Sequence, residues 1–315
     1  MRAVPDLPLV FTVNDLRRRG VTGKQAEYRV ARGVWHRLRR GVFCTAEAWQ
    51  RAGAEGRHVL TAAATVAGAR APQSLVLSHT TAAALHELPV PAGRLKVVTL
   101  TSPRGADRAT GDDRRVYVAG LPQADVETRH GIPVTTVHRT VADCLRHLPV
   151  GDAVAVADAA VREGATTVED LRTVLAAQTG WPFSAAAALR LELVDGRRES
   201  PLESRSAVVM AAHGVPRPRL QCRIVDSHGV VVARVDFAWL EVGVVGEADG
   251  QVKYRDGAPG VLRREKDRHA ILESLGLVVV RWDERHLHGV EPVLVTRLRA
   301  GFARADPRRF LGRAA

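Results

Sequence analysis

The sequence has little of what would place it in a membrane or in an oxidising compartment. No stretch approaches the roughly 20 uninterrupted apolar residues of a membrane-spanning helix, and Asp6 lies where a secretory signal would continue its apolar core. The cysteines, Cys44, Cys144 and Cys222, are far apart and form neither a CxxC pair nor a zinc-ligand spacing. These absences argue against a disulfide framework and a zinc cluster, and we expect a soluble cytoplasmic protein with reduced thiols.

Lysine is scarce too, with only four residues among 46 Lys and Arg. The surplus over 34 Asp and Glu is therefore arginine, and the formal net charge is +12. Such a charge predicts a polyanion partner, because Lys and Arg release condensed counterions from a phosphate backbone. A compositional bias toward Arg and Ala would give the same charge without any partner, and composition leaves that alternative open.

Length and apolar content limit the number of domains and show whether the chain can form a buried core. A chain of 315 residues predicts about two domains. A hydrophobic content of 46% is enough for buried cores, so the chain is not disordered as a whole.

The first fifty residues are unusually basic, with ten Lys and Arg against four acids. Thr12 and Thr22 are placed to cap two short helices, which Gly20 and Gly33 end. The segment 34–43 is typical of a strand-turn-strand, so the pattern predicts a winged helix-turn-helix. Two basic helices with merely solvated faces would show the same pattern. In the DNA-binding interpretation the major groove is contacted by Lys24, Gln25, Tyr28 and Arg29, and phosphates by Arg37, Arg39 and Arg40.

The middle of the chain is predicted to be mostly helical, with a few short strands. His79 and His86 are seven residues apart on a predicted helix with no carboxylate partner, so we interpret them as packing or hydrogen-bonding groups rather than metal ligands. Nothing in this block has catalytic spacing. We expect helices over 57–71, 137–148, 152–162, 168–178 and 184–194, and strands over 75–77, 96–100 and 115–119.

These two segments resemble a known family. Residues 10–45 are similar to the winged helix-turn-helix of abortive-infection type IV antitoxins (AbiEi-like), and the segments 77–86, 132–135 and 139–143 resemble that family's second domain. The resemblance implies a DNA-binding transcriptional autoregulator that opposes a partner nucleotidyltransferase toxin. The chain departs from the family upstream of the helix pair, where Pro5 and Pro8 disfavour the helix that usually comes first.

The pattern changes after a polar hinge at 197–200. The sequence then predicts a helix, three strands, a helix, a strand and a further helical turn, which is the order of a restriction-endonuclease-like core. The expected bounds are 200–212 for the helix, 220–225, 230–239 and 242–248 for the strands, 261–275 for the second helix and 277–282 for the last strand.

Acidic side chains are predicted where these strands end. Glu203 lies on the opening helix, Asp236 late in the second strand, and Glu247 and Asp249 on one face of the third. Lys253 follows. Phosphodiester hydrolysis needs carboxylates that bind Mg²⁺, because the ion polarises the phosphate and lowers the pKa of the attacking water, and a nearby cation stabilises the developing charge. We therefore predict a catalytic set here, with Asp236, Glu247 and Asp249 as metal ligands.

Each of these acids also has a purely structural interpretation. Glu203 follows Ser200 by three residues, as in a capping box. Asp236 could pair with Arg234 or Lys253, and Asp249 could form a turn with the glycine that follows it.

About 85 residues, from Ser200 to Leu287, resemble the very-short-patch-repair-like branch of the PD-(D/E)xK nucleases. By that resemblance Asp236 and Glu247 ligate Mg²⁺, for which Mn²⁺ can substitute, Asp249 and Glu203 complete the site, and Lys253 or Gln221 positions phosphate or water. Asp249 stands where the named motif has lysine. The segments that carry the resemblance are 201–203, 214–221, 235–238, 247–250, 253–254 and 275–282.

The sequence thus predicts an α/β multi-domain protein. Residues 1–50 are the winged helix-turn-helix, 51–196 the antitoxin-like α+β middle domain, and 197–315 the restriction-endonuclease-like domain with a basic tail. We expect DNA binding joined to Mg²⁺-dependent endonuclease activity, in phage defence or a toxin-antitoxin system. The alternative is a non-catalytic DNA-binding regulator with an inactive nuclease fold. Both classes often pair into homodimers, and the sequence leaves the choice between DNA and RNA open.

Overall fold

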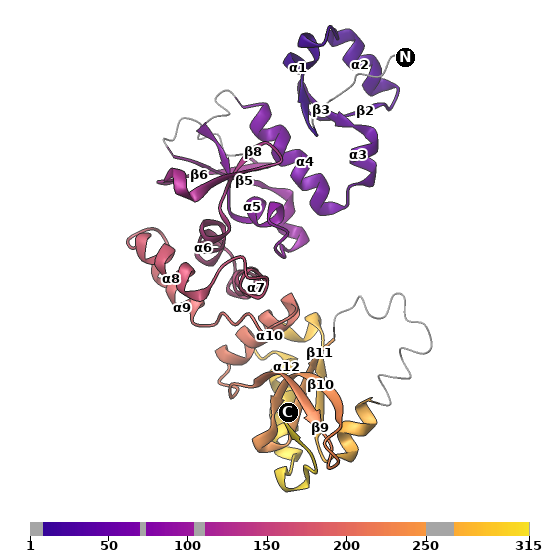
Figure 1. Cartoon of the computed structure of the whole chain (residues 1–315), viewed down its shortest axis with the longest axis vertical. Coiled ribbons are helices and arrows are strands. Elements are labelled where there is room, and N and C mark those ends of the chain that lie inside the picture. The colour runs from indigo at the N-terminus through magenta and orange to yellow at the C-terminus, as the bar shows by residue number, and fades with distance from the viewer. Residues whose placement is uncertain (1–8, 70–73, 104–110, 250–267, 315) are drawn as a thin grey trace. The chain divides into compact units, whose positions relative to one another are not determined.

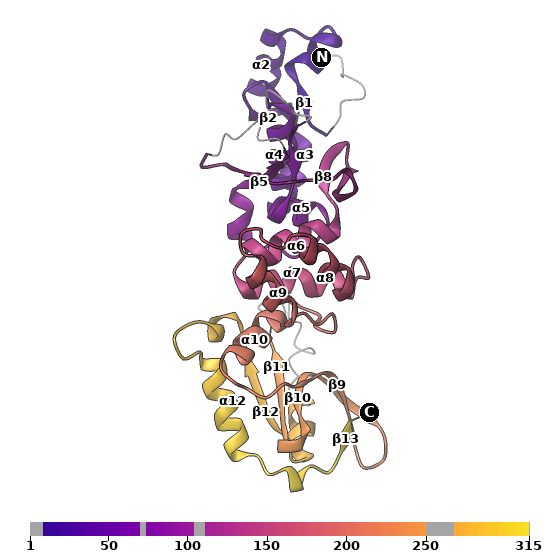
Figure 2. The ribbon, with the colours of Figure 1, turned by 90° about the vertical axis from the view of Figure 1, so that its left-hand side faces the viewer.

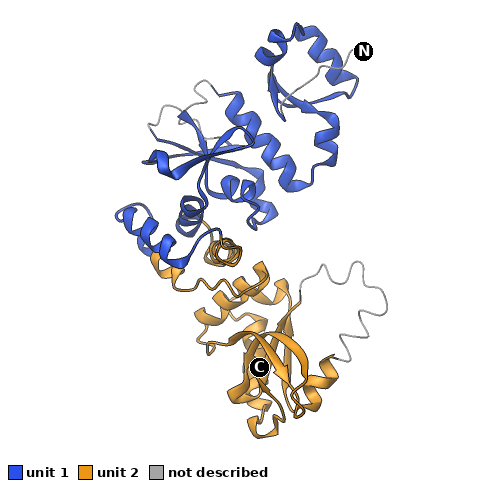
Figure 3. Cartoon of the chain, viewed as in Figure 1, with its two compact units in different colours: residues 1–147, 165–187 blue, residues 148–164, 188–315 orange. Residues whose placement is uncertain are grey.

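The computed structural model describes residues 9–69, 74–103, 111–249 and 268–314. These residues form a mixed α/β protein with one three-stranded and two five-stranded sheets (Figures 1 and 2). The chain divides into two compact units (Figure 3). The first unit is residues 1–147 with 165–187, and the second is 148–164 with 188–315. Over the described ranges, no helix is both long and apolar enough to cross a membrane.

Two capped helices and a hairpin open the first unit. Thr12 and Thr22 each accept a hydrogen bond from the backbone N–H three residues on, and the side chains of Asp15 and Gln25 return one to the cap residue. The predicted helix pair and hairpin are therefore confirmed as elements. They are β1 (Phe11–Thr12), α1 (Val13–Arg18), α2 (Gly23–Ala31), β2 (Trp35–Arg39) and β3 (Val42–Thr45), and the sheet has the order β1-β3-β2.

A five-stranded sheet forms the rest of the first unit with the helices around it. Buried apolar side chains of α4, α5 and three of the strands make its core, and partly buried Val116 of β6 packs against it. The strand order is β6-β5-β4-β8-β7, with both parallel and antiparallel neighbours. The elements are α3 (Ala46–Arg51), α4 (Ala54–Ala67), β4 (Val76–Leu77), α5 (His79–Leu85), β5 (Val98–Ser102), β6 (Arg114–Val118), β7 (Val126–Arg129), β8 (Ile132–Thr135), α6 (Val137–His147), α8 (Val168–Ala177) and α9 (Ser184–Leu191).

Two of these strands were not predicted. β7 and β8 pair with each other antiparallel, and β8 also pairs with β4. β7 is an edge strand of half-buried and exposed residues, Val126 to Arg129, and it has no clear alternation of apolar and polar residues. β8 contains Pro133, and a proline argues against predicting a strand because it cannot donate a backbone hydrogen bond. The middle of the chain is therefore less helical than the sequence suggested.

Helix α7 (Val150–Arg162) belongs to the second unit, where it packs on α10 (Pro201–Ala212). The buried carboxylate of Asp158 joins the two segments. It accepts hydrogen bonds from Arg198 (2.7 Å) and Ser204 (2.7 Å), and from the backbone N–H of Asp195 (2.7 Å). The division into 1–50, 51–196 and 197–315 stays a prediction, but α7 lies with the residues beyond 188.

The sheet of the second unit has the order β12-β11-β10-β9-β13. β9, β10 and β11 are antiparallel neighbours, whereas β11 and β12 are parallel. The predicted order of helices and strands is confirmed where it is described, and α12 and β13 are additional. The elements are β9 (Arg219–Val225), β10 (Val231–Trp239), β11 (Val244–Ala248), β12 (Val278–Trp282), α12 (Val293–Arg304) and β13 (Arg313–Ala314).

Both faces of this sheet are covered. One core contains Phe237 and Trp282 together with side chains of α10 and α12. The other contains Val235 and Val245 with Leu272, which comes from a helix through residues 268–274. Short 3-10 helices complete the chain: η2 (Ala92–Lys96), η3 (Gln123–Asp125), η4 (Leu240–Val242), η6 (Glu284–Leu287) and η7 (Pro307–Arg309).

Gly246 tests how closely this sheet is packed. A Cβ atom at Gly246 would lie 2.6 and 2.8 Å from two ring atoms of Trp282. Gly246→Ala should therefore destabilise the second unit by about 1–3 kcal/mol, as overpacking of a core does. Calorimetric unfolding of the full chain measures this. Gly93→Ala, where a Cβ atom would have no neighbour within 4 Å, is the control, and equal transition temperatures for the two variants would contradict the prediction.

Candidate functional site

The predicted groove-contacting residues lie on α2, and the predicted phosphate-contacting residues lie on the hairpin. Lys24, Gln25 and Tyr28 are exposed on α2, and Arg40 is exposed at the turn between β2 and β3. Gln25 also has a structural role, because its Oε1 accepts the backbone N–H of Thr22 (2.9 Å). Lys24, Tyr28 and Arg40 are thus presented to solvent, where a nucleic acid could reach them.

The other three predicted DNA contacts are engaged within the chain. The guanidinium of Arg29 lies over the Trp35 ring, 5.0 Å from its centroid. Arg37 forms an ion pair with Glu27. Arg39 bonds to Asp113 (2.7 Å) and to Thr65 (2.7 Å). The ion pairs of Arg37 with Glu27 and of Arg39 with Asp113 neutralise part of the positive charge that we expected to contact phosphates.

In the second unit, Glu203 links the start of α10 to β9. Ser200 caps α10, and Glu203 accepts hydrogen bonds from the Ser200 hydroxyl (2.8 Å) and from the backbone N–H of Glu199 (3.0 Å). Its Oε2 also accepts from Gln221 Nε2 (2.7 Å). The predicted capping box is present in part: Ser200 caps the helix through the Glu203 N–H, but the Glu203 carboxylate accepts the backbone N–H of Glu199 instead of that of Ser200. The same carboxylate reaches a side chain 18 residues further along.

Register brings Asp236 to the same place. Cys222 pairs with Val235 and Leu220 with Phe237, so Gln221 of β9 lies opposite Asp236. Gln221 has φ of +52°, a left-handed conformation that side chains other than glycine seldom adopt. Backbone strain of this kind gathers at functional sites, and the sequence carried no sign of it.

Asp236 and Glu203 influence each other electrostatically. Burial raises the pKa of the Glu203 carboxyl, and the negative charge of Asp236 raises it further, against the opposite effect of the hydrogen bonds from Glu199, Ser200 and Gln221. A pair of carboxyls in such an arrangement favours a bound proton or a cation.

Glu247 lies on the neighbouring strand. Phe237 pairs with Gly246, and the same register sets Asp236 opposite Glu247. The two strands are also tied by Asp236 itself, since its Oδ2 accepts the backbone N–H of Ala248 (2.9 Å). The antiparallel pairing of β10 and β11 therefore sets two of the predicted metal ligands side by side.

Two arginines balance the charge of Glu247, which is 3% exposed. Arg281 Nη2 lies 2.6 Å from its Oε2 and Arg268 Nη2 lies 2.9 Å from its Oε1. The parallel pairing of β11 with β12 puts Arg281 directly beside Glu247. Neither carboxylate oxygen accepts a well-directed hydrogen bond from a described residue. The contacts are close, yet both buried oxygens lack hydrogen-bond partners in the described part of the chain.

Asp249 lies in an open pocket beyond the carboxyl ends of β11 and β12. Its backbone N–H donates to the carbonyl of Trp282 (2.8 Å). The pocket has a volume of about 480 Å³ and is lined by Asp249, Arg281, Trp282, Asp283, Arg285, His286 and Arg297. Lys253, the predicted cation of the site, lies outside the described residues.

The predicted site is therefore brought together in part. Glu203, Gln221 and Asp236 are neighbours, Glu247 stands beside Asp236 but pairs with arginines, and Asp249 belongs to the pocket. Within the described ranges, no three His, Cys, Asp or Glu residues form a group that could hold a metal ion. Sequence reasoning missed the role of Arg281 and Arg268, because their contacts with Glu247 span more than 20 residues of chain.

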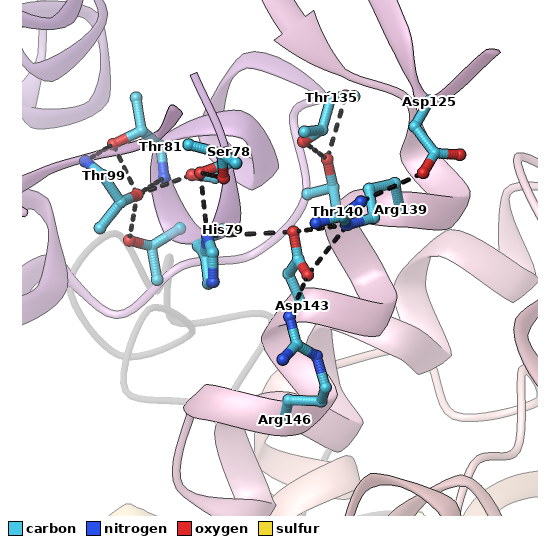
Figure 4. Close-up of polar contacts among 12 residues, drawn as sticks. Ser78, His79, Thr81, Thr99, Asp125, Thr135, Arg139, Thr140, Asp143 and Arg146 are labelled. Carbon is cyan, nitrogen blue, oxygen red and sulfur yellow. Dashed lines mark hydrogen bonds and ion pairs between the residues drawn. The ribbon is translucent and has the colours of Figure 1, made fainter. Parts of the chain in front are cut away.

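A second buried polar cluster lies in the first unit (Figure 4). Asp143 is fully buried and accepts hydrogen bonds from Arg139 Nε (3.1 Å) and Arg146 Nη2 (2.6 Å). Arg139 Nη1 also reaches Asp125 (3.1 Å). His79 Nδ1 is 2.9 Å from Ser78 Oγ and 3.9 Å from Asp143 Oδ2. The spacing of the charged residues, at i, i+4 and i+7 of α6, is the sequence signal that could have pointed to this cluster.

This cluster is structural, because its groups are closed to solvent. The ring of His79 stacks on Tyr117 with centroids 3.8 Å apart, and the residue has φ of +51°. His86 has its Nε2 2.7 Å from the carbonyl oxygen of Thr135. Both histidines pack and form hydrogen bonds as predicted, but each also has a carboxylate oxygen 3.9 Å from its Nδ1, from Asp143 for His79 and from Glu127 for His86, which the sequence did not predict.

The burial of His79 predicts an acid-sensitive first unit. Burial lowers the pKa of His79 from 6.5 to about 3, with Asp143 opposing the shift and nearby cations adding to it. The unfolded chain therefore binds this proton first, and stability falls as the pH drops below 6.5 toward 3. At one pH unit below 6.5 the loss should be about 1.4 kcal/mol.

Calorimetry of the wild type and of His79→Asn between neutral and mildly acidic pH measures this loss. Asparagine tolerates the left-handed backbone but does not titrate. The variant should keep the shallower pH dependence due to His36, His58 and His86, whose pKa values burial also lowers. Equal slopes for the two proteins would refute the assignment.

Comparison with known proteins gives relatives without a described function. No family model matches the chain. Two curated Mycobacterium tuberculosis proteins, one from each of two strains and both named as uncharacterized, are 36% identical to it over 141 residues. The match covers 45% of this chain and 51% of theirs, so the chain spans about half the length of the curated relatives it matches.

Proposed function

We propose that the protein binds DNA through a winged helix-turn-helix at residues 11–45, and that its second unit is a restriction-endonuclease-like domain that hydrolyses phosphodiester bonds with Mg²⁺. One observation carries the nuclease proposal. Three acids from separate segments gather on neighbouring elements: Glu203 of α10 through Gln221, Asp236 of β10, and Glu247 of β11 opposite it. Chains seldom place several acids together inside a sheet without a functional reason.

The residues present suit a hard divalent cation. Their metal-binding atoms are carboxylate oxygens, which Mg²⁺ prefers. Both Glu247 oxygens are buried, and they are held by the ion pairs with Arg281 and Arg268 rather than by well-directed hydrogen bonds. Asp236 and Glu247 would hold the ion, with Glu203 beside them. When bound, Mg²⁺ would polarise the phosphate and lower the pKa of the attacking water.

The surrounding residues have separate tasks in this proposal. Gln221 orients the Glu203 carboxylate by its hydrogen bond to Oε2. The pKa of the Glu203 carboxyl is raised. A higher pKa makes its carboxylate a stronger base, which is better able to accept a proton from water. The packed sheet fixes the spacing of Asp236 and Glu247, because β10 and β11 are held by their ladder and by the bond from Ala248 to Asp236.

A second function is a DNA-binding, antitoxin-like regulator whose nuclease fold does not cut. The ion pairs of Glu247 with Arg268 and Arg281 favour it, since they supply the counter-charge that a metal would otherwise bring. Asp249 in place of the motif's lysine favours it too. In this case the cytoplasmic partner would be a nucleotidyltransferase toxin, and the regulator would act as a homodimer on paired half-sites.

Cleavage assays decide between these functions. Purified full-length protein should cut plasmid or single-stranded DNA in Mg²⁺ or Mn²⁺, and Asp236→Asn or Glu247→Gln should lower the rate by about a hundredfold or more, as loss of a metal ligand does. Gel shifts in EDTA report binding alone. Persistent binding without cleavage in either metal would reject the enzyme and support the regulator.

Substitutions of exposed basic residues in the first unit should weaken DNA binding more than a substitution of a basic residue that is bonded to other side chains of the chain. Lys24→Ala and Arg40→Ala should each weaken duplex binding roughly fivefold and reduce the salt slope by about one phosphate contact. Arg39→Ala, which removes a side chain bonded to Asp113 and Thr65, should leave the slope nearly unchanged. Fluorescence anisotropy at several salt concentrations measures both quantities, and a larger slope change for Arg39 would count against the proposed surface.

A further inference from the structure

The pocket beside the carboxylates carries an excess of positive charge. Three arginines line it, Arg281, Arg285 and Arg297, against Asp249 and Asp283. Asp283 and Arg285 are paired with each other, since Asp283 caps η6 and accepts three hydrogen bonds from the Arg285 guanidinium. Arg297 is exposed and donates to the carbonyl oxygen of Arg281 (2.7 Å). The pocket therefore suits an anion that can accept several N–H groups, as a phosphate does.

Arg281 belongs to both the pocket and the carboxylate site. It lines the pocket, its side chain is 27% exposed, and its Nη2 lies 2.6 Å from Glu247. That ion pair lacks hydrogen-bond geometry, because neither the Arg281 Nη2 nor the Glu247 oxygens have a well-directed partner among the described residues. A guanidinium–carboxylate contact without paired hydrogen bonds is weaker than a bidentate one.

Glu247 cannot lose its counter-charge without a replacement. It is 3% exposed, and a buried charge left without a partner costs about 3–5 kcal/mol. Arg268 stays 2.9 Å from Glu247 Oε1 when Arg281 turns toward an anion in the pocket, so one counter-charge remains and Glu247 Oε2 is left for another cation. The two events, anion binding in the pocket and cation binding at Glu247, are coupled through this one side chain.

We propose that the pocket binds a phosphate group of a nucleic-acid strand, and that Arg281 exchanges Glu247 for this phosphate and so opens Glu247 to a divalent cation. This inference rests on the proposed nuclease function, because it concerns the same carboxylates. Arg281 is a positioning residue that takes the place of the lysine missing from the motif. Binding of nucleic acid then raises the affinity of Glu247 for the divalent cation, and the protein without nucleic acid binds the ion weakly.

The first test measures phosphate binding without metal. The probe is a short fluorescein-labelled single-stranded deoxyoligonucleotide in EDTA, bound by full-length protein that also carries Lys24→Ala and Arg40→Ala to weaken the contribution of the first unit. Arg297→Gln and Arg281→Gln should each weaken binding about tenfold, as loss of a charged hydrogen bond does. Arg299→Gln is the matched control on the same helix, because Arg299 pairs with Glu291 (3.1 Å) and does not line the pocket.

The second test measures Mn²⁺ binding by electron paramagnetic resonance. In the wild type without oligonucleotide, Mn²⁺ should bind weakly. Arg281→Gln should bind it about tenfold more tightly without oligonucleotide, since one competing cation is gone. A role of Arg281 in stability alone would not raise this affinity. Glu247→Gln should abolish the gain.

Three outcomes separate the ideas. Equal oligonucleotide affinity for Arg297→Gln, Arg281→Gln and Arg299→Gln would overturn the phosphate pocket. Unchanged or weaker Mn²⁺ binding by Arg281→Gln would overturn the exchange. Failure of the wild type to cleave any DNA, with the expected binding results intact, would reject the nuclease function and leave the pocket as a nucleic-acid contact.

Discussion

A buried carboxylate in the middle of a sheet is the constraint around which the second unit is arranged. Glu247 shares its strand with the buried residues Val244 and Val245, and an ionised group there is stable only with a counter-charge. Arg281 and Arg268 supply it from β12 and from the helix over 268–274. Because parallel strands need a crossover connection, the chain must leave the sheet after β11 and return as β12 to bring Arg281 alongside.

Local chemistry is what the sequence predicted well. Thr12 with Asp15 and Thr22 with Gln25 form capping boxes within four residues of chain, and Ser200 caps α10 in the same way. Such bonds depend on the spacing of residues in one helical turn, so the helix starts could be placed without knowledge of the fold. The same holds for the alternation of buried and exposed residues in β10, which is long enough to be recognised.

Contacts between distant segments could not be predicted. The pairing of Glu247 with Arg281 depends on the register of two strands that are far apart in sequence, and no single-sequence signal fixes that register. The left-handed backbone of Gln221 and of His79 is imposed by tertiary packing against a local preference. β7 was missed because its residues are only partly buried, so they lack the apolar pattern that identifies a strand.

The chain passes between its two compact units three times, after residues 147, 164 and 187. The segment 148–164 thereby supplies α7, whose Asp158 neutralises Arg198 inside the second unit. A single cut in the chain cannot separate one complete unit from the other. Recombination between residues 158 and 198 would leave the buried guanidinium of Arg198 without its carboxylate, and recombination after residue 147 would remove residues 165–187 from the first unit, so the two units are expected to be inherited together.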